Sequence, residues 1–174
     1  MPASPDELFA FLDRLGIATS TVEHPPLFTV EQSRSLRGAI TGGHTKNLFL
    51  VDRKDRLFLV VAEEDAAIDL KHLHRVIGAS GRLSFGKAEV LRTTLGVEPG
   101  SVSPFAAIND AAHAVTIVLD EALMRHAELN FHPLVNTRTT RIRREDLLRF
   151  LAACGHPPMI LAVSAPGADV TGPA

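Results

Sequence analysis

The feature that most constrains this chain is a pair of apolar runs separated by a short charged joint. Residues 46–51 and 56–62 are rich in Leu, Val and Phe, and all four residues over 52–55 are charged. Two apolar runs around a short polar joint predict the strands and the turn of a β-hairpin. The hairpin commits the chain to a β-sheet, and every other element has to be placed around that sheet.

Helix and strand signals alternate irregularly along the rest of the sequence. Ser4, Pro5 and Glu7 predict a capping box at the start of a first helix, which Gly16 ends. Further helices are expected after Thr29, after Asp69, over 87–95 and from Arg144, and further strands over 17–23, 82–85, 114–120, 129–131, 137–141 and 159–163. This irregular order predicts an α/β (α+β) fold, in which helices pack on a mixed sheet. We expect one domain over residues 1–165 and a flexible tail over 166–174.

The composition argues against several classes of protein. A formal net charge of −2 over 174 residues gives no overall field that attracts nucleic acid, so any polyanion has to meet a local patch. The single cysteine, Cys154, forms no internal disulfide and fits a reducing compartment. The N-terminus lacks the basic start and apolar run of a signal peptide, and the apolar runs are too short to span a bilayer. We expect a soluble, cytoplasmic protein without membrane contact.

No motif for a metal or for a catalytic nucleophile is present. His72 and His74 are two residues apart, so on the expected helix they would point to different faces. No cysteine pair, His-Glu-x-x-His sequence or carboxylate cluster accompanies them. Cys154 has no evident base nearby and is better interpreted as a small core residue. We therefore expect neither a metal site nor a cofactor.

The entrance of the hairpin is the first candidate for a binding site. Lys46 and Asn47 open its first strand directly after the glycine pair at 42–43. A fixed cation at the mouth of a strand can meet a ligand that arrives over the glycine loop. The solvated start of an ordinary strand would give the same pattern, because lysine is mostly exposed.

Three further segments are open to two interpretations each. The loop over 96–100 contains two glycines and a proline, so its backbone can approach a ligand closely or simply connect two elements. His132 is polar among apolar neighbours, as either a half-buried histidine or a substrate contact. A basic run could follow phosphates or form a solvated corner; it consists of Arg138, Arg141, Arg143 and Arg144.

Taken together, these segments resemble one family. They are His24-Pro25-Pro26 with Phe28-Thr29, the glycine-rich approach to Lys46-Asn47, the helix from Asp69, Ser84-Phe85, the 96–102 loop, and Phe131-His132-Pro133 with Asn136-Thr137. In this order they are similar to the YbaK/ProX group, free-standing relatives of the editing domain inserted in bacterial prolyl-tRNA synthetases. The resemblance spans residues 5–163 and implies that domain's fold, with a barrel-like mixed sheet surrounded by helices. Lys46-Asn47 together with the sequence around His132 is most similar to the subgroup called ProXp-ala.

The resemblance implies hydrolysis of the ester between an amino acid and the terminal ribose of a tRNA, without a metal, a cofactor or a protein nucleophile. It implies catalytic roles for Lys46, Asn47 and His132, and substrate contacts from Phe28, Thr29, Gly96, Val97, Pro99 and Gly100. The partner that it implies is the acceptor end of an aminoacyl-tRNA, with prolyl-tRNA synthetase as a further candidate.

The subgroup implies trans-editing of Ala-tRNA(Pro). Two alternatives stay open at this point. One is a deacylase for another mischarged tRNA, such as Cys-tRNA(Pro) or a mis-serylated tRNA. The other is a non-catalytic module that binds tRNA or a synthetase.

Overall fold

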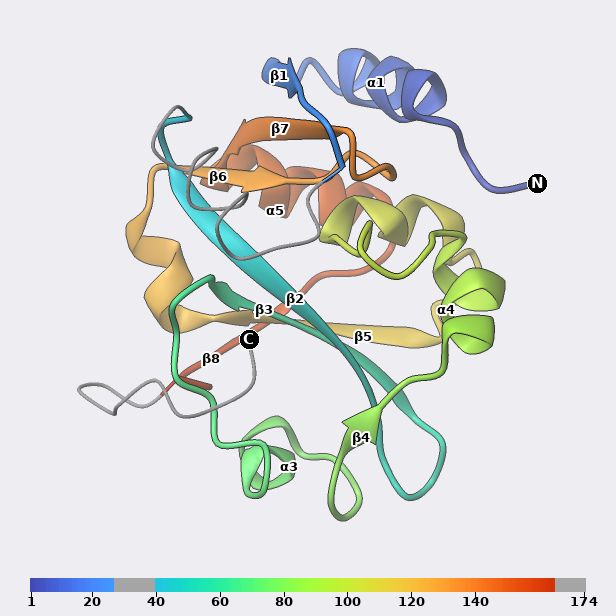
Figure 1. The fold of residues 1–174 in the computed structure, drawn as a ribbon, viewed down its shortest axis with the longest axis vertical. Helices are drawn as coiled ribbons and strands as arrows, with labels where there is room; N and C mark the ends of the chain where they lie inside the picture. The colour runs from blue at the N-terminus through green and yellow to red at the C-terminus, as the bar shows by residue number, and fades with distance from the viewer. Residues whose placement is uncertain (27–39, 165–174) are drawn as a thin grey trace.

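The computed structural model describes residues 1–26 and 40–164, and its centre is one mixed β-sheet (Figure 1). The described strands are β1 (Thr19–Glu23), β2 (Gly43–Val51), β3 (Leu57–Glu63), β4 (Ser84–Phe85), β5 (Val115–Asp120), β6 (Glu128–Phe131), β7 (Arg138–Arg143) and β8 (Met159–Leu161). They lie in the order β1-β7-β6-β2-β3-β5-β8, and β4 pairs with β2 outside this order. Three neighbouring pairs, β2–β6, β3–β5 and β5–β8, are parallel, and the other pairs are antiparallel. The predicted mixed α/β fold is confirmed.

The predicted hairpin is confirmed as β2 and β3, which pair with Leu48 opposite Val60. The Asp52 carboxylate closes the turn between them. It accepts hydrogen bonds from the backbone N–H groups of Lys54 and Arg56 and from the Arg56 guanidinium, each at 2.9 Å. Burial works to raise the pKa of Asp52, but the hydrogen bonds that it accepts outweigh burial and lower the pKa to about 2. A permanent carboxylate therefore holds the tip of the hairpin.

Helices cover both faces of the sheet, and each face has its own core. The elements on one face are α1 (Pro5–Arg14), α4 (Ala88–Leu95), α5 (Arg144–Ala153) and the 3-10 helices η1 (Pro104–Asn109) and η2 (Glu121–Arg125). The other face is covered by α3 (Leu73–Ile77) and the segments that flank it. Phe49 belongs to the first core and Leu48 to the second. Side chains alternate along a strand, so odd-numbered residues of β2 face the first core and even-numbered residues face the second.

The expected helix starts are confirmed at one end of the chain and corrected in the middle. The Ser4 hydroxyl accepts from the Glu7 N–H at 3.2 Å, and the Glu7 carboxylate accepts from the Ser4 N–H at 3.2 Å, which is the predicted capping box. Asp69, in contrast, does not cap α3. Its carboxylate accepts from the Lys71 N–H at 3.1 Å and lies 2.7 Å from His72 Nδ1. This local turn competes with the helix, so α3 begins only after His72.

Two predicted segments lie outside the described residues, and two observed helices were not predicted. The helix expected after Thr29 and the tail expected over 166–174 lie outside 1–26 and 40–164. The two 3-10 helices were not predicted, because short helices of three residues per turn carry no long periodic signal. Within the described part of the chain, no helix is both long enough and apolar enough to cross a membrane.

A buried hydrogen bond between two side chains joins the end of η1 to the segment after α5. The side chains of Asp110 and His156 are 3% and 2% exposed, and Nε2 of the histidine lies 2.8 Å from Oδ2 of the aspartate. The same carboxylate accepts from the N–H groups of Ala114 at 3.0 Å and Val115 at 2.9 Å, where β5 begins. Burial works to raise the pKa of Asp110, but the hydrogen bonds from His156 and these N–H groups outweigh it and lower the pKa.

We expect Asp110→Asn to lower the free energy of unfolding by about 1–3 kcal/mol, because an amide cannot accept from all three donors. A carboxyl whose pKa is lowered by folding stabilises the protein above its unfolded pKa, and this contribution is lost as the pH falls through the folded pKa. In urea denaturation, the free energy of unfolding of Asp110→Asn should therefore be lower than that of wild type at neutral pH, and this difference should become smaller as the pH falls. Asp13→Asn, on the exposed face of α1, is the control. Equal stability of wild type and Asp110→Asn at neutral pH would contradict the prediction.

Candidate active site

Lys46 lies in the first half of β2, and its ammonium group is half-buried and tethered. Nζ donates a hydrogen bond to the carbonyl oxygen of Ala66 at 2.6 Å. Burial lowers the pKa of Lys46, while the carboxylates of Asp65 and Glu64 work in the opposite direction. An ammonium group has three donors. A partly desolvated cation of this kind, held in place by a main-chain carbonyl, is suited to contact an anionic or carbonyl oxygen of a ligand.

The two glycines before Lys46 serve close packing. Gly42 has a φ of 97°, and a Cβ there would lie 3.0 Å from Nδ2 of Asn130. A Cβ on Gly43 would lie 2.7 Å from the ring of His126. Asn130 is 3% exposed and donates from Nδ2 to the Gly43 carbonyl oxygen at 3.2 Å. The start of β2 is therefore pressed against β6, and this contact sets the position of Lys46.

Asn47 faces the opposite side of the sheet from Lys46. It lies across from Val61, whose side chain belongs to the first core, whereas Lys46 lies across from Ala62, which belongs to the second. The Asn47 Oδ1 atom is buried and accepts no hydrogen bond within residues 1–26 and 40–164. Buried polar atoms without a partner are uncommon, so a donor group of a ligand at this position would satisfy the amide. The neighbouring pair in the sequence thus contributes to two faces of β2.

The parallel pairing of β2 with β6 brings His132 toward the same end of the sheet as Lys46. The last paired residues of these strands are His44 and Asn130, and Lys46 and His132 each lie two residues further along. Nδ1 of His132 lies 3.0 Å from the carbonyl oxygen of Arg138. A carbonyl oxygen can only accept, so Nδ1 carries the proton and, in the neutral ring, Nε2 keeps its lone pair.

A second histidine, His24, lies beside His132; its sequence motif contributed to the family resemblance, but no catalytic or binding role was predicted for it. The ring centroids of His24 and His132 are 6.2 Å apart. Nδ1 of His24 donates to the carbonyl oxygen of Pro25 at 2.9 Å, and its Nε2 lies 2.8 Å from the Thr139 hydroxyl. Burial lowers the pKa of His132, the hydrogen bond to Arg138 works against this, and the charge of His24 lowers the pKa further. His132 is therefore poised as a neutral proton acceptor.

The 96–100 loop divides into a structural half and an exposed half. Gly96 has a φ of 64°, and a Cβ there would lie 2.8 Å from Nδ2 of Asn109, so the glycine is required by packing. Val97 is buried in the first core, which leaves only its main chain available to a ligand. Pro99 and Gly100 are exposed.

The exposed half of the loop lies near the segment that carries His132. A Cβ on Gly100 would lie 3.7 Å from Nδ2 of Asn136. The hydroxyl of Ser103, which is fully buried, donates to the His132 carbonyl oxygen at 2.7 Å. Ser103 was missed by sequence reasoning, because a lone serine in a loop gives no signal. It fastens the loop to the His132 segment.

The remaining candidates are the basic run, Phe28 and Thr29, a metal site and Cys154. Three members of the basic run, Arg138, Arg141 and Arg144, have carboxylate partners in Glu23, Glu128 and Glu145 respectively. Arg143 is exposed and has no ion pair among the described residues. The three pairs favour the solvated-corner interpretation of the run. Phe28 and Thr29 lie outside the described residues. Among the residues that are described, no group of three or more His, Cys, Asp or Glu side chains could hold a metal ion. Burial raises the pKa of Cys154 to about 12, so its thiol stays protonated and is a poor nucleophile.

Comparison with known families gives one match over most of the chain. The model of the aminoacyl-tRNA editing domain matches residues 24–150, a range that contains Lys46, His132 and the 96–100 loop. The matched range also includes His24 at its first position. All the described residues of the candidate site therefore lie within the matched domain.

Two curated proteins are similar over nearly their whole length. Prolyl-tRNA synthetase associated domain-containing protein 1 of Danio rerio is 41% identical over 158 residues, which are 90% of this chain and 85% of that protein. Prolyl-tRNA editing protein ProX of Acetoanaerobium sticklandii is 37% identical over 150 residues, or 86% of this chain and 91% of that protein. A crystal structure described as a candidate trans-editing enzyme for prolyl tRNA synthetase superposes with a TM-score of 0.66 at 22% identity, covering 92% of this chain and 98% of that one. At that identity the likeness concerns the fold alone.

Proposed function

Because the chain belongs to the family of aminoacyl-tRNA editing domains, we propose that it is a trans-editing deacylase that hydrolyses mischarged Ala-tRNA(Pro). The observation that carries the proposal is the tethered, partly desolvated Lys46 cation on β2, together with the neutral imidazole of His132, which follows the paired part of the neighbouring strand β6. An enzyme that hydrolyses an ester must stabilise the oxyanion and remove a proton from water. A fixed cation and a neutral imidazole are suited to these two tasks.

In the proposed reaction, the oxygen of a water molecule bonds to the ester carbonyl carbon, and the bond from that carbon to the ribose oxygen breaks. Lys46 stabilises the negative charge that develops on the substrate. His132 accepts a proton through Nε2 or orders the water that loses it, and a proton ends on the ribose oxygen. The products are a free amino acid and an uncharged tRNA. An aminoacyl ester is already activated, so positioning and charge stabilisation suffice without a protein nucleophile.

Removal of alanine is supported by the resemblance of Lys46-Asn47 and His132 to the alanine-specific subgroup and by a general limit on selection. A pocket that distinguishes ligands by one methylene group gains only about 1–3 kcal/mol. A synthetase that selects proline therefore admits smaller amino acids at a low rate. A second site that is too small for proline can remove them.

The test is a deacylation panel with alanyl, cysteinyl, seryl and prolyl esters of proline tRNA, and alanyl-tRNA(Ala) as a further control. We expect hydrolysis of Ala-tRNA(Pro) above the rate in buffer, with Pro-tRNA(Pro) at the buffer rate. Preferential hydrolysis of the cysteinyl or seryl ester would make alanine the wrong substrate. Saturable tRNA binding with no hydrolysis in any arm would instead identify a non-catalytic binding module, with a synthetase as its candidate partner.

A further inference from the structure

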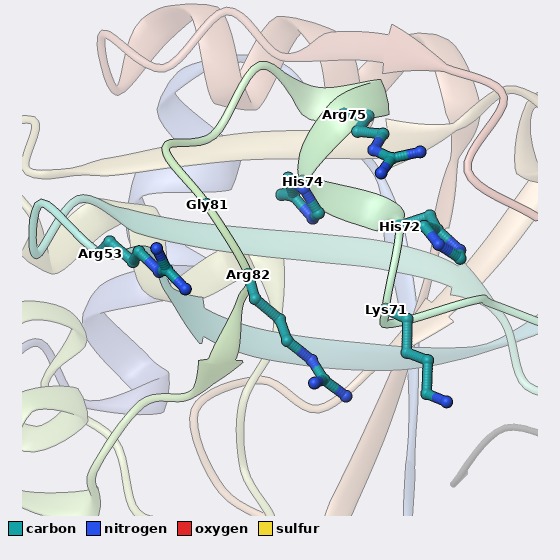
Figure 2. A pocket seen from close by; sticks show the side chains of 7 residues that line it. All are labelled: Arg53, Lys71, His72, His74, Arg75, Gly81 and Arg82. Atoms are coloured by element: carbon teal, nitrogen blue, oxygen red, sulfur yellow. The ribbon is translucent and has the colours of Figure 1, made fainter.

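A second polar site lies on the face of the sheet that α3 covers, at the tip of the hairpin. It is a cavity of about 460 Å³, and four of its lining side chains are cationic: Arg53, Lys71, Arg75 and Arg82. Figure 2 shows that they come from three segments, with Arg53 at the hairpin turn, Arg82 before β4, Lys71 just before α3 and Arg75 on α3. We call these four residues and the space between them the basic cavity.

The four cations of the basic cavity form no direct ion pair with a carboxylate of the described residues. All four are exposed. Several other arginines of the chain do have a carboxylate partner, as Arg56 with Asp52 and Arg92 with Glu98 illustrate. Four unpaired cations around one hollow, in a chain of net charge −2, concentrate positive potential where an anion can enter.

The two histidines of α3 and its N-terminal turn also line the basic cavity, contrary to the expectation that they point to different faces. The reason is that His72 precedes the first turn of α3 and His74 lies within it. The Nδ1 atom of His74 is buried and has no hydrogen-bond partner among the described residues. A phosphate oxygen is an acceptor, so it would satisfy this atom in the Nδ1–H form of the ring.

The cavity is held in shape by the hairpin turn. The backbone N–H of Arg53 donates to the Ser80 carbonyl oxygen at 2.9 Å, and the Asp52 carboxylate accepts from the Ser80 N–H at 2.9 Å. A Cβ on Gly81 would lie 2.5 Å from Cδ of Arg53, so the arginine lies directly on the glycine. These contacts fix Arg53 against the segment that carries Arg82 before any ligand arrives, which reduces the entropy lost on binding.

Residues 66–82 connect the surroundings of Lys46 to the basic cavity, and this segment lies on the face of the sheet that α3 covers. Lys46 is tethered to Ala66 at the beginning of this stretch, and Arg82 lies near its end. Arg53 lies seven residues beyond Lys46 along β2 and its turn, which corresponds to at most about 23 Å at 3.3 Å per residue. A ligand that reaches both places is extended and carries several negative charges.

We propose that the basic cavity binds the phosphodiester backbone of the RNA whose aminoacylated end lies at Lys46. The identity of the ligand as RNA rests on the proposed function, whereas the anion site rests on the cavity itself. Guanidinium groups favour phosphate, because their paired N–H donors match two phosphate oxygens. The basic cavity therefore increases the affinity for the RNA and fixes its position on the protein, and ester hydrolysis takes place at Lys46 and His132.

The test measures how binding of an uncharged proline tRNA transcript depends on salt. Both Arg75 and Arg82 are replaced in the variant Arg75→Gln/Arg82→Gln, which keeps Arg53 and its contacts with Ser80 and Gly81. The control is Arg143→Gln, an exposed arginine on β7 that has no ion pair within the described residues. We expect the slope of log affinity against log salt to decrease in magnitude by about 0.7–0.9 for each phosphate contact removed. The loss of affinity should be largest at low salt, and Arg143→Gln should match wild type.

A second measurement separates this inference from the proposed function. Hydrolysis of the alanyl ester of adenosine, which has no phosphodiester backbone, should be unchanged in the double variant, while hydrolysis of Ala-tRNA(Pro) at limiting substrate should slow. An unchanged salt slope in the double variant would overturn the basic cavity as an RNA site, whatever the deacylation panel shows. Equal losses of tRNA affinity in Arg143→Gln and in the double variant would also overturn the basic cavity as an RNA site, because such losses would reflect net charge alone. Reduced tRNA binding without any ester hydrolysis would overturn only the proposed reaction.

Discussion

Replacing Lys46 by alanine is expected to lower the rate constant for deacylation of Ala-tRNA(Pro) by about 10²–10³-fold, the usual effect of removing one donor that stabilises an oxyanion. The Nζ atom is tethered to the Ala66 carbonyl oxygen and partly desolvated. A cation in such a position needs little reorganisation when negative charge develops on the substrate, so its loss acts on the transition state more than on the fold. Single-turnover hydrolysis of the charged tRNA measures the change.

Two further variants identify the charge as the cause. Lys46→Met keeps most of the apolar stem and removes the ammonium group, so we expect it to be as impaired as Lys46→Ala. Lys54→Ala removes an exposed lysine from the hairpin turn and leaves its hydrogen-bonded backbone in place, so it should keep wild-type turnover. Thermal unfolding of each variant confirms that the fold persists. Wild-type turnover in Lys46→Met would show that Lys46 is only a charge at the start of a strand.

Local sequence patterns predicted the elements of this fold well. The hairpin followed from two apolar runs and a charged joint, and the first helix from Ser4 and Glu7. These signals depend on residues that are close in sequence, so one chain suffices to find them. The start of α3 was placed too early. The Asp69 side chain forms a local turn with Lys71 and His72, and this turn competes with the first turn of a helix.

The composition of the candidate site could be predicted only in part, because its members meet through pairing between distant strands. Lys46 and His132 were candidates from their sequence context, and their catalytic roles were proposed from a resemblance. The parallel pairing of β2 with β6 brings them toward the same end of the sheet. The contact of His24 with His132 depends on β1 and β7, which lie more than 100 residues apart in the chain. The basic cavity was also not predicted, because its arginines are scattered over three segments and no run of basic residues marks it.

Replacing His132 by alanine is expected to reduce deacylation by about 10²-fold or more, within the range for loss of a general acid–base group. Nδ1 of His132 donates to the Arg138 carbonyl oxygen, which leaves Nε2 as the acceptor. Burial lowers the pKa of His132 from its ordinary value of 6.5, so the neutral, active form persists into mildly acidic solution. The rate should therefore be level near neutral pH and fall only as the pH drops through this lowered pKa. A pH–rate profile, corrected for uncatalysed ester hydrolysis, measures the midpoint of that fall.

The variant His24→Gln distinguishes a role for His132 in proton transfer from a role in packing. The charge of His24 lowers the pKa of His132, and glutamine can keep a hydrogen bond to the Thr139 hydroxyl while removing that charge. We expect the acid limb of the profile to move to higher pH in His24→Gln, with the rate near neutral pH little changed. An acid limb that persists in His132→Ala would assign the titration to another group. An unmoved limb in His24→Gln would mean that the two rings are not coupled. The first result would reduce His132 to a structural residue that anchors the end of β6 to the start of β7, whereas the second would exclude only the influence of His24 on His132.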